Sequence, residues 1–285
     1  MSLFESFVLG IVQGLTEFIP VSSTAHLRII PALVGWEDPG AAYTAVIQLG
    51  TLVAALIYFR GDIRDLTWAA LRSLVRADAR RTPAARLAWA IAVGNLPIVV
   101  LGLAFRHFIE TGARSLVLIA VMLIAVALLL AFAERSARQT LTLASLGFWR
   151  AQAVGLAQAL ALIPGASRSG STILGGLWVG LKRAEATRFS FLLGLPAIFG
   201  AGVFQALALL RQAGAGEGGV GAPSLGVPYD LAALGVGMLA AGLSGYWSIG
   251  FLLRYLSRRS TFVFNLYRIA LGVGILGLVA LGLVR

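Results

Sequence analysis

Two short stretches gather polar residues inside otherwise apolar regions. The first, EFIPVSSTAH at 17–26, holds a carboxylate, three hydroxyls and an imidazole. The second, PGASRSGST at 164–172, holds hydroxyls, two glycines and an arginine. A carboxylate can bind a cation, a hydroxyl can act as a nucleophile, and an arginine beside free backbone N–H groups can bind an anion such as phosphate.

Residue spacing predicts which side chains of the first stretch meet. Gln13 and Glu17 are four residues apart, so a helix places both on one face. Pro20 ends that helix, and three hydroxyl residues follow where a second helix needs a cap. These hydroxyl residues are Ser22, Ser23 and Thr24. Because Ser23 and His26 are three apart, a carboxylate, a hydroxyl and an imidazole are expected to converge across the break.

A structural interpretation of the same residues is also available. Serines that cap a helix, a histidine at the membrane interface and a glutamate that reaches water would account for each residue taken alone. In apolar surroundings, however, a single charge costs about 2.5–3.5 kcal/mol. The combination therefore favours a functional site.

The second stretch has the features of an anion site at a helix start. Gly165 allows close approach of the backbone, and Arg168 supplies a forked cation that matches phosphate. The hydroxyls expected around the anion belong to Ser167, Ser169 and Thr172. The alternative is a capped helix whose arginine reaches lipid headgroups. Because no acid lies nearby in sequence, we expect both Glu17 and an anionic ligand as partners of Arg168.

Composition indicates what holds these stretches. The chain is 59% hydrophobic and 12% charged, with a mean hydropathy of +0.88. Soluble domains average about 45–50% apolar and about 25% charged residues. The chain is therefore predicted to be an all-α polytopic membrane protein, and we interpret its net charge of +11 as a topology signal, with no nucleic acid as partner.

Six stretches are long enough to cross a bilayer core of about 30 Å at about 1.5 Å per residue. They are 41–60, 87–105, 115–133, 189–210, 230–256 and 262–284. Four shorter apolar pieces flank the two polar stretches: 3–19, 27–35, 151–163 and 173–181. Short pieces broken by Pro and Gly predict two re-entrant helix-loop-helix hairpins that line a cavity. Gln48, in the first span, can lend the site a hydrogen bond or simply bond a neighbouring helix, and Arg268 is expected to snorkel.

The two halves of the sequence resemble each other. GIVQGLTEFIPVSST at 10–24 is echoed by GLAQALALIPGASRS at 155–169, with one residue dropped before the proline. This predicts an inverted-topology repeat, about 1–133 and about 147–285, within a single membrane domain, 1–285. In such repeats the site lies near the midplane, where the broken helices meet.

Basic residues orient the chain. Sixteen of the 23 Lys and Arg residues fall in the connections 60–86, 134–150, 182–188 and 254–259. The positive-inside rule makes these connections cytoplasmic and both termini external. The first hairpin then enters from outside and the second from the cytoplasm, while the Gly- and Pro-rich connection 211–229 is external. The Arg-rich segment 61–86 is expected to lie on anionic membrane lipid.

QGLTEFIPVSSTAH at 13–26 and PGASRSGST at 164–172 resemble the two signature motifs of the undecaprenyl-diphosphatase family, membrane enzymes linked to bacitracin resistance. The resemblance covers the whole chain in segment order and includes AVIQLG at 45–50 and FSFLLGLPA at 189–197. It implies hydrolysis of undecaprenyl diphosphate to the monophosphate and inorganic phosphate. It also implies a divalent cation and a bacterial inner-membrane location, in which the termini that the charge count places outside are periplasmic.

The resemblance also suggests roles for the site residues. Arg168 and the groups at 167–172 would neutralise the diphosphate, helped by Ser22 and Thr24. Glu17, assisted by Gln13, would hold Mg²⁺ or Ca²⁺. Many family members carry glutamate where this chain has Gln13, so most of the cation binding falls on Glu17.

The expected chemistry is attack on the terminal phosphorus by Ser23, with His26 as general base or acid. Ser22, a water molecule and His26 itself remain alternative nucleophiles. A polyprenyl-phosphate transporter or flippase is the alternative function, because inverted repeats with broken helices are transporter architecture. A hydroxyl, imidazole and carboxylate set favours the enzyme. The oligomeric state stays open, a homodimer included.

Overall fold

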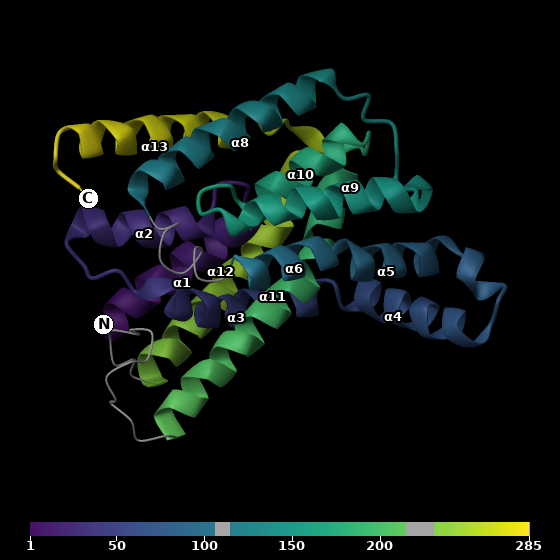
Figure 1. The fold of residues 1–285 in the computed structure, drawn as a ribbon, viewed down its shortest axis with the longest axis horizontal. Coiled ribbons are helices and arrows are strands. Elements are labelled where there is room, and N and C mark those ends of the chain that lie inside the picture. The colour runs from purple at the N-terminus through teal and green to yellow at the C-terminus, as the bar shows by residue number, and fades with distance from the viewer. Residues whose placement is uncertain (106–114, 215–230, 285) are drawn as a thin grey trace.

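The computed structural model describes residues 1–105, 115–214 and 231–284, and these are helical apart from their connections and one isolated β-bridge (Figure 1). The expected connection 211–229 lies mostly outside the described residues. The helices of the first half are α1 Leu3–Phe18, α2 Ser23–Val34, α3 Gly40–Tyr58, α4 Arg60–Val75, α5 Pro83–Gly94, α6 Leu96–Ala104 and α8 Leu116–Ser136. Those of the second half are α9 Phe148–Gln158, the 3-10 helix η3 Ala159–Leu162, α10 Arg168–Trp178, α11 Arg183–Gly214, α12 Leu231–Arg258 and α13 Phe262–Ala280.

The prediction of an all-helical chain with about six apolar spans is confirmed. By length and composition, five stretches are able to cross a membrane: Pro83–Ala104, Leu116–Ser136, Arg183–Phe204, Leu231–Arg258 and Phe262–Ala280. The predicted span 41–60 corresponds to α3, which meets α4 at a bend of 78°. The span 87–105 is interrupted at Asn95, immediately before Leu96-Pro97, because proline cannot donate the next backbone hydrogen bond.

The two polar stretches form matching breaks. Ser22 precedes α2 with φ +74°, and Ser167 precedes α10 with φ +68°. The two hydroxyls accept from the backbone N–H of Ala25, at 3.4 Å, and of Gly170, at 3.1 Å. Residues other than glycine occupy this region only at a cost of about 1–3 kcal/mol, which the surroundings must offset. The two breaks are therefore built in the same way.

Small residues let the helices around these breaks approach closely. A Cβ at Gly10 on α1 would lie 2.4 Å from the carbonyl oxygen of Gly237 on α12. A Cβ at Gly155 on α9 would lie 2.3 Å from the carbonyl oxygen of Gly94 on α5. In each case a helix that leads into a break packs against a helix of the other half of the chain. These contacts fix the two breaks relative to the whole bundle.

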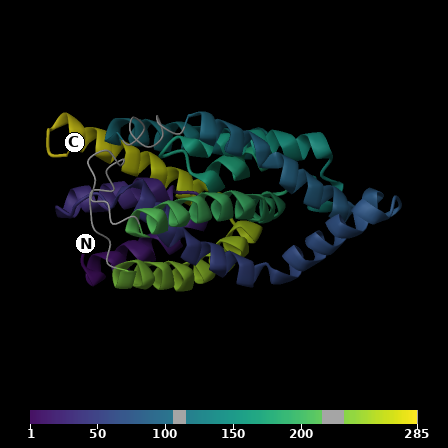
Figure 2. The same cartoon turned by 60° about the horizontal axis from the view of Figure 1, so that its bottom comes forward.

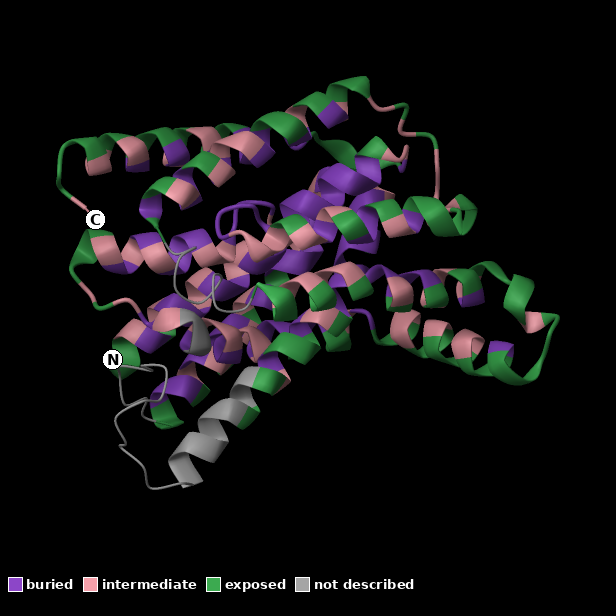
Figure 3. Cartoon of the chain, in the orientation of Figure 1, coloured by how far each residue is buried: buried purple, intermediate pink, exposed green. Residues whose placement is uncertain are grey.

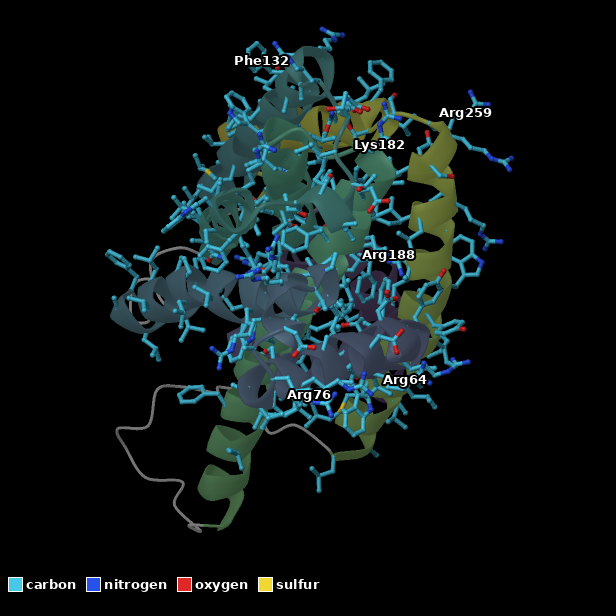
Figure 4. All side chains as sticks on the ribbon, turned by 90° about the vertical axis from the view of Figure 1, so that its right-hand side faces the viewer. Arg64, Arg76, Phe132, Lys182, Arg188 and Arg259 are labelled. Atoms are coloured by element: carbon cyan, nitrogen blue, oxygen red, sulfur yellow. The ribbon has the colours of Figure 1, made fainter. Side chains whose placement is uncertain are left out.

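Both termini lie at one end of the molecule, and the connection between α4 and α5 lies at the other (Figures 1 and 2). Figure 4 views the molecule from this second end, where Arg64, Arg76, Lys182 and Arg188 belong to connections predicted to be cytoplasmic. Buried residues gather in α10 and in the connection before it, while outward faces of the surrounding helices are exposed (Figure 3). The polar breaks therefore lie within the bundle.

Candidate active site

The carboxylate of Glu17 is the point at which the two polar stretches meet. Its side chain is 3% exposed. Its Oε1 accepts from Gln48 Nε2 at 2.6 Å and from Arg168 Nη2 at 3.0 Å. Its Oε2 accepts from Gln13 Nε2 at 2.9 Å and from Ser23 Oγ at 2.7 Å. One carboxylate thus joins α1, α2, α3 and α10.

These contacts match several expectations from spacing. Gln13 and Glu17 share a face of α1, and Arg168 has Glu17 as its negative partner. Gln48 was expected to bond either to the site or to a neighbouring helix. Its hydrogen bond does both, because it links α3 to α1 and ends on the Glu17 carboxylate. A buried ion pair is tolerated only where further hydrogen bonds satisfy the remaining lone pairs, and two are supplied to each carboxylate oxygen here.

Only one of the three guanidinium nitrogens of Arg168 takes part in its ion pair. Nη2 binds Glu17, whereas Nε and Nη1 are buried and have no hydrogen-bond partner among the described residues. Gly194 on α11 provides the space for this group, since a Cβ there would lie 1.5 Å from Nη1. Buried N–H groups without partners are costly. Arg168 therefore holds donors suited to an anionic ligand.

A cavity of about 200 Å³ opens between the two breaks. Its polar side is formed by residues that were predicted from the sequence to belong to a site: Glu17, Ser22, Ser23, Thr24, Gln48, Gly165, Ser167 and Arg168. Its apolar side comes largely from α6, η3 and α11, through Ile98, Ala161, Ala197, Ile198 and Ala201. A ligand with a charged head and an apolar tail would match both sides.

His26 lies away from this cavity. Its Nδ1 donates to the carbonyl oxygen of Ser22 at 2.7 Å, and its Nε2 is 2.7 Å from the hydroxyl of Tyr267 on α13. The two rings are stacked with centroids 5.6 Å apart. Since a carbonyl only accepts, Nδ1 carries a proton. His26 and Ser23 share α2 as predicted, but the imidazole supports the backbone of the first break and does not contact the Ser23 hydroxyl.

Three further predicted residues also lie outside the cavity lining. Ser169 Oγ donates to the carbonyl of Ile19 at 3.2 Å, and Thr172 Oγ1 donates to the carbonyl of Arg168 at 2.7 Å. As the second and fifth residues of α10, they turn these hydroxyls toward the helix and its neighbours. Gln13 donates to Glu17 from outside the lining, and its buried Oε1 has no hydrogen-bond partner in the part of the chain that the structure describes.

Three residues that shape the site were given no role in it from residue spacing. Gly194 leaves room for Arg168, Tyr267 binds His26, and Arg268 contacts both breaks. Arg268 is fully buried, so the expectation that it snorkels is wrong. An arginine six residues into an apolar span is itself a signal of function, because such charges are expensive and face the bundle interior. No comparable signal marks Gly194.

Comparisons with known proteins place this geometry in context. A family model described as bacitracin resistance protein BacA matches residues 6–274. A relative named undecaprenyl-diphosphatase, from Chlorobium phaeobacteroides (strain BS1), is 52% identical over 289 residues, which cover 99% of each chain. A protein of the same name from Myxococcus xanthus (strain DK1622) is 52% identical over 282 residues, 99% of this chain and 91% of that one.

The space beside Gly194 allows a direct test of the anion site. We expect Gly194→Ala to weaken binding of inorganic pyrophosphate at least ten-fold, because the new methyl displaces the Arg168 guanidinium. Isothermal titration calorimetry on the purified protein in detergent measures this. Gly200→Ala is the matched control on the same helix, since a Cβ there meets nothing within 4 Å. Equal pyrophosphate affinities for both variants would contradict the role of Arg168.

Proposed function

The chain belongs to the family of the bacitracin resistance protein BacA, and we propose that the cavity between its two helix breaks is its active site. The protein is a membrane hydrolase that converts undecaprenyl diphosphate to undecaprenyl phosphate and inorganic phosphate. This reaction recycles the lipid carrier of cell-wall synthesis, with bacitracin resistance as a consequence. The relatives' activity favours hydrolysis over the transporter or flippase alternative.

The observation that carries the proposed site is the contact between Glu17 and Arg168, two residues from opposite halves of the chain. It borders a cavity that is polar on one side and apolar on the other. The free N–H groups of Arg168 are suited to the diphosphate, and preorganised donors of this kind stabilise the charge that develops on phosphoryl oxygens. The apolar side is suited to the first part of the polyprenyl tail.

We assign the attack on the terminal phosphorus to Ser23. In the assigned step, Oγ bonds to phosphorus, the bond from phosphorus to the bridging oxygen breaks, and undecaprenyl phosphate leaves. Glu17 accepts the hydroxyl proton, because Ser23 Oγ already donates to its Oε2. Water then releases inorganic phosphate from the serine. The contacts of His26 favour support of the Ser22 carbonyl over proton transfer.

The residues around Glu17 fit a divalent cation that is bound mainly by the substrate. Among the described residues no group of three or more His, Cys, Asp or Glu side chains could hold a metal ion. The nearest side-chain oxygens are the carboxylate of Glu17, which would exchange the donor Ser23 or Gln48 for the cation, and Oε1 of Gln13, which has no partner among the described residues. Mg²⁺ is often held by one or two carboxylates together with substrate phosphates. When bound, Mg²⁺ or Ca²⁺ would neutralise diphosphate oxygens.

Several contacts support an inverted-topology repeat within a single domain, 1–285, with halves of about 1–133 and about 147–285. The two breaks share a serine cap with positive φ, and the glycines that lead into them pack on opposite halves. Leu3 and Phe148 begin the first helices, and Ser23 and Arg168 the second, with equal separations. These equal separations favour an alignment of 10–24 with 155–169 in which no residue is dropped before the proline. In this arrangement two re-entrant hairpins enter the inner membrane from opposite sides, with periplasmic termini.

Release of phosphate from undecaprenyl diphosphate tests the site residues. We expect Glu17→Gln to lower kcat/KM at least a hundred-fold, about 2.7 kcal/mol, because the neutral isostere loses the ion pair. Arg168→Lys should lower it at least ten-fold, because a point charge lacks the fork. Ser23→Ala should lower kcat at least ten-fold more than Ser22→Ala.

The matched control for that panel is Glu5→Gln, at the other end of α1. Glu5 accepts from the backbone N–H of Ser2 in a capping box, a role that glutamine can also fill. Wild-type turnover is expected for this variant. Near-normal turnover of Glu17→Gln would remove Glu17 from the site, and equal, mild losses in the two serine variants would mean that neither serine attacks.

Replacing Gln13 tests the cation. We expect Gln13→Glu to lower the Mg²⁺ concentration needed for half-maximal phosphate release at least three-fold, because a second carboxylate joins Glu17. Gln152→Glu, on α9, is the control and should leave this concentration unchanged, since Gln152 donates to the carbonyl of Ala90 away from the cavity. Full activity of the wild type after chelation of divalent cations would refute the requirement for a divalent cation.

Labelling of single cysteines tests the orientation, since the chain has none of its own. Phe4, near the start of α1, and Trp149, near the start of α9, are 66% and 82% exposed. A membrane-impermeant maleimide should label Phe4→Cys in intact spheroplasts and Trp149→Cys only after permeabilisation. Labelling of both variants from the same side would refute the opposite entry of the two hairpins.

A further inference from the structure

Arg268 on α13 is a buried charge without an acidic partner. Its exposed fraction is 0%. Among the described residues no carboxylate forms an ion pair with it, whereas Arg168 has Glu17. A lone charge in a membrane interior is retained only where it serves a function or where many dipoles compensate it. The partners of Arg268 therefore indicate what it does.

Its hydrogen bonds to the described residues are all to backbone carbonyl oxygens. Nη1 donates to Pro20 at 3.2 Å, in the first break. Nη2 donates to Gly165 at 3.0 Å and to Ala166 at 2.9 Å, in the second break. Nε donates to Leu123 on α8 at 3.2 Å. A single guanidinium thus binds both breaks and anchors them to a third helix.

The breaks need such a partner because the carbonyls of Pro20, Gly165 and Ala166 lie in the connections between helices, where no helix supplies a donor. Inside a bundle these carbonyls cannot bond to bulk water, and an unpaired buried carbonyl is costly. Tyr267, the preceding residue of α13, supports the first break as well, through His26 and the Ser22 carbonyl.

We propose that Arg268 is a positioning residue for the hydrolysis: by holding both breaks on one guanidinium, it sets the approach of Ser23 and Glu17 to Arg168. This inference rests on the site proposed above. Reacting groups must be held in near-attack geometry, and an error of about 1 Å can cost about a hundred-fold in rate. Misalignment of the two halves of the site therefore lowers kcat more than it raises KM.

Gly170→Ala tests the proposal without removing a buried charge. A Cβ at Gly170 on α10 would lie 2.5 Å from Arg268 Nη1, the nitrogen that donates to Pro20. Alanine is also a better helix former than glycine, so the substitution raises the helix propensity of α10 itself. We expect kcat for phosphate release to fall at least ten-fold, with KM changed less than three-fold. Gly274→Ala on α13 is the control, because a Cβ there meets nothing within 4 Å.

A second variant assigns the effect to Arg268 itself. Arg268→Lys keeps the charge, but one ammonium cannot replace a fork that reaches both breaks and α8. It should show the same loss of kcat with a nearly unchanged KM. The folded fraction of each variant is measured by thermal unfolding in detergent. Each rate of phosphate release is divided by this fraction.

Wild-type kcat per folded molecule in either Gly170→Ala or Arg268→Lys would overturn the proposal, as would losses that disappear on normalisation. Glu17→Gln and Arg168→Lys are measured in parallel. If those two variants keep their activity, the proposed site is wrong. If they lose it while the Arg268 and Gly170 variants do not, only the positioning role is wrong.

Discussion

The structure depends on one buried ion pair, between Glu17 and Arg168. Each charge would be costly alone at membrane depth, and together they are stable only with their remaining lone pairs satisfied. Gln13, Gln48 and Ser23 supply those hydrogen bonds, so four helices must meet at one carboxylate. The helix breaks place the first residues of α2 and α10, Ser23 and Arg168, at this point.

The surroundings of the pair hold an excess of positive charge. Arg268 donates to carbonyls of both breaks, and Nε and Nη1 of Arg168 have no hydrogen-bond partner among the described residues. An anion in the cavity that Arg168 lines would compensate this positive charge, which suits a diphosphate better than a neutral ligand. The apolar side formed by α6 and α11 is suited to the lipid part of the substrate. The proposed site thus divides charge recognition and lipid recognition between two sides of one cavity.

The geometry of the proposed site is maintained by backbone contacts as well as by side-chain contacts. Ser22 and Ser167 hold strained conformations before α2 and α10, which place the first residues of those helices, Ser23 and Arg168, in contact with the same carboxylate. The carbonyls around the breaks are bound by His26 and Arg268. His26, expected from the sequence to be a general base or acid, contacts the Ser22 carbonyl and Tyr267 in the structure, which favours support of the backbone.

The sequence by itself determined the helical class, the approximate spans, the two breaks and the pairing of Gln13 with Glu17, because hydropathy, proline and helical spacing act locally. It also indicated that Arg168 needs an acid from elsewhere. Only the tertiary structure decided that His26 binds Tyr267, that Arg268 is buried between the breaks, and that Gly194 leaves room for Arg168. These contacts join helices more than a hundred residues apart, or depend on the absence of a side chain, and neither leaves a periodic pattern in the sequence.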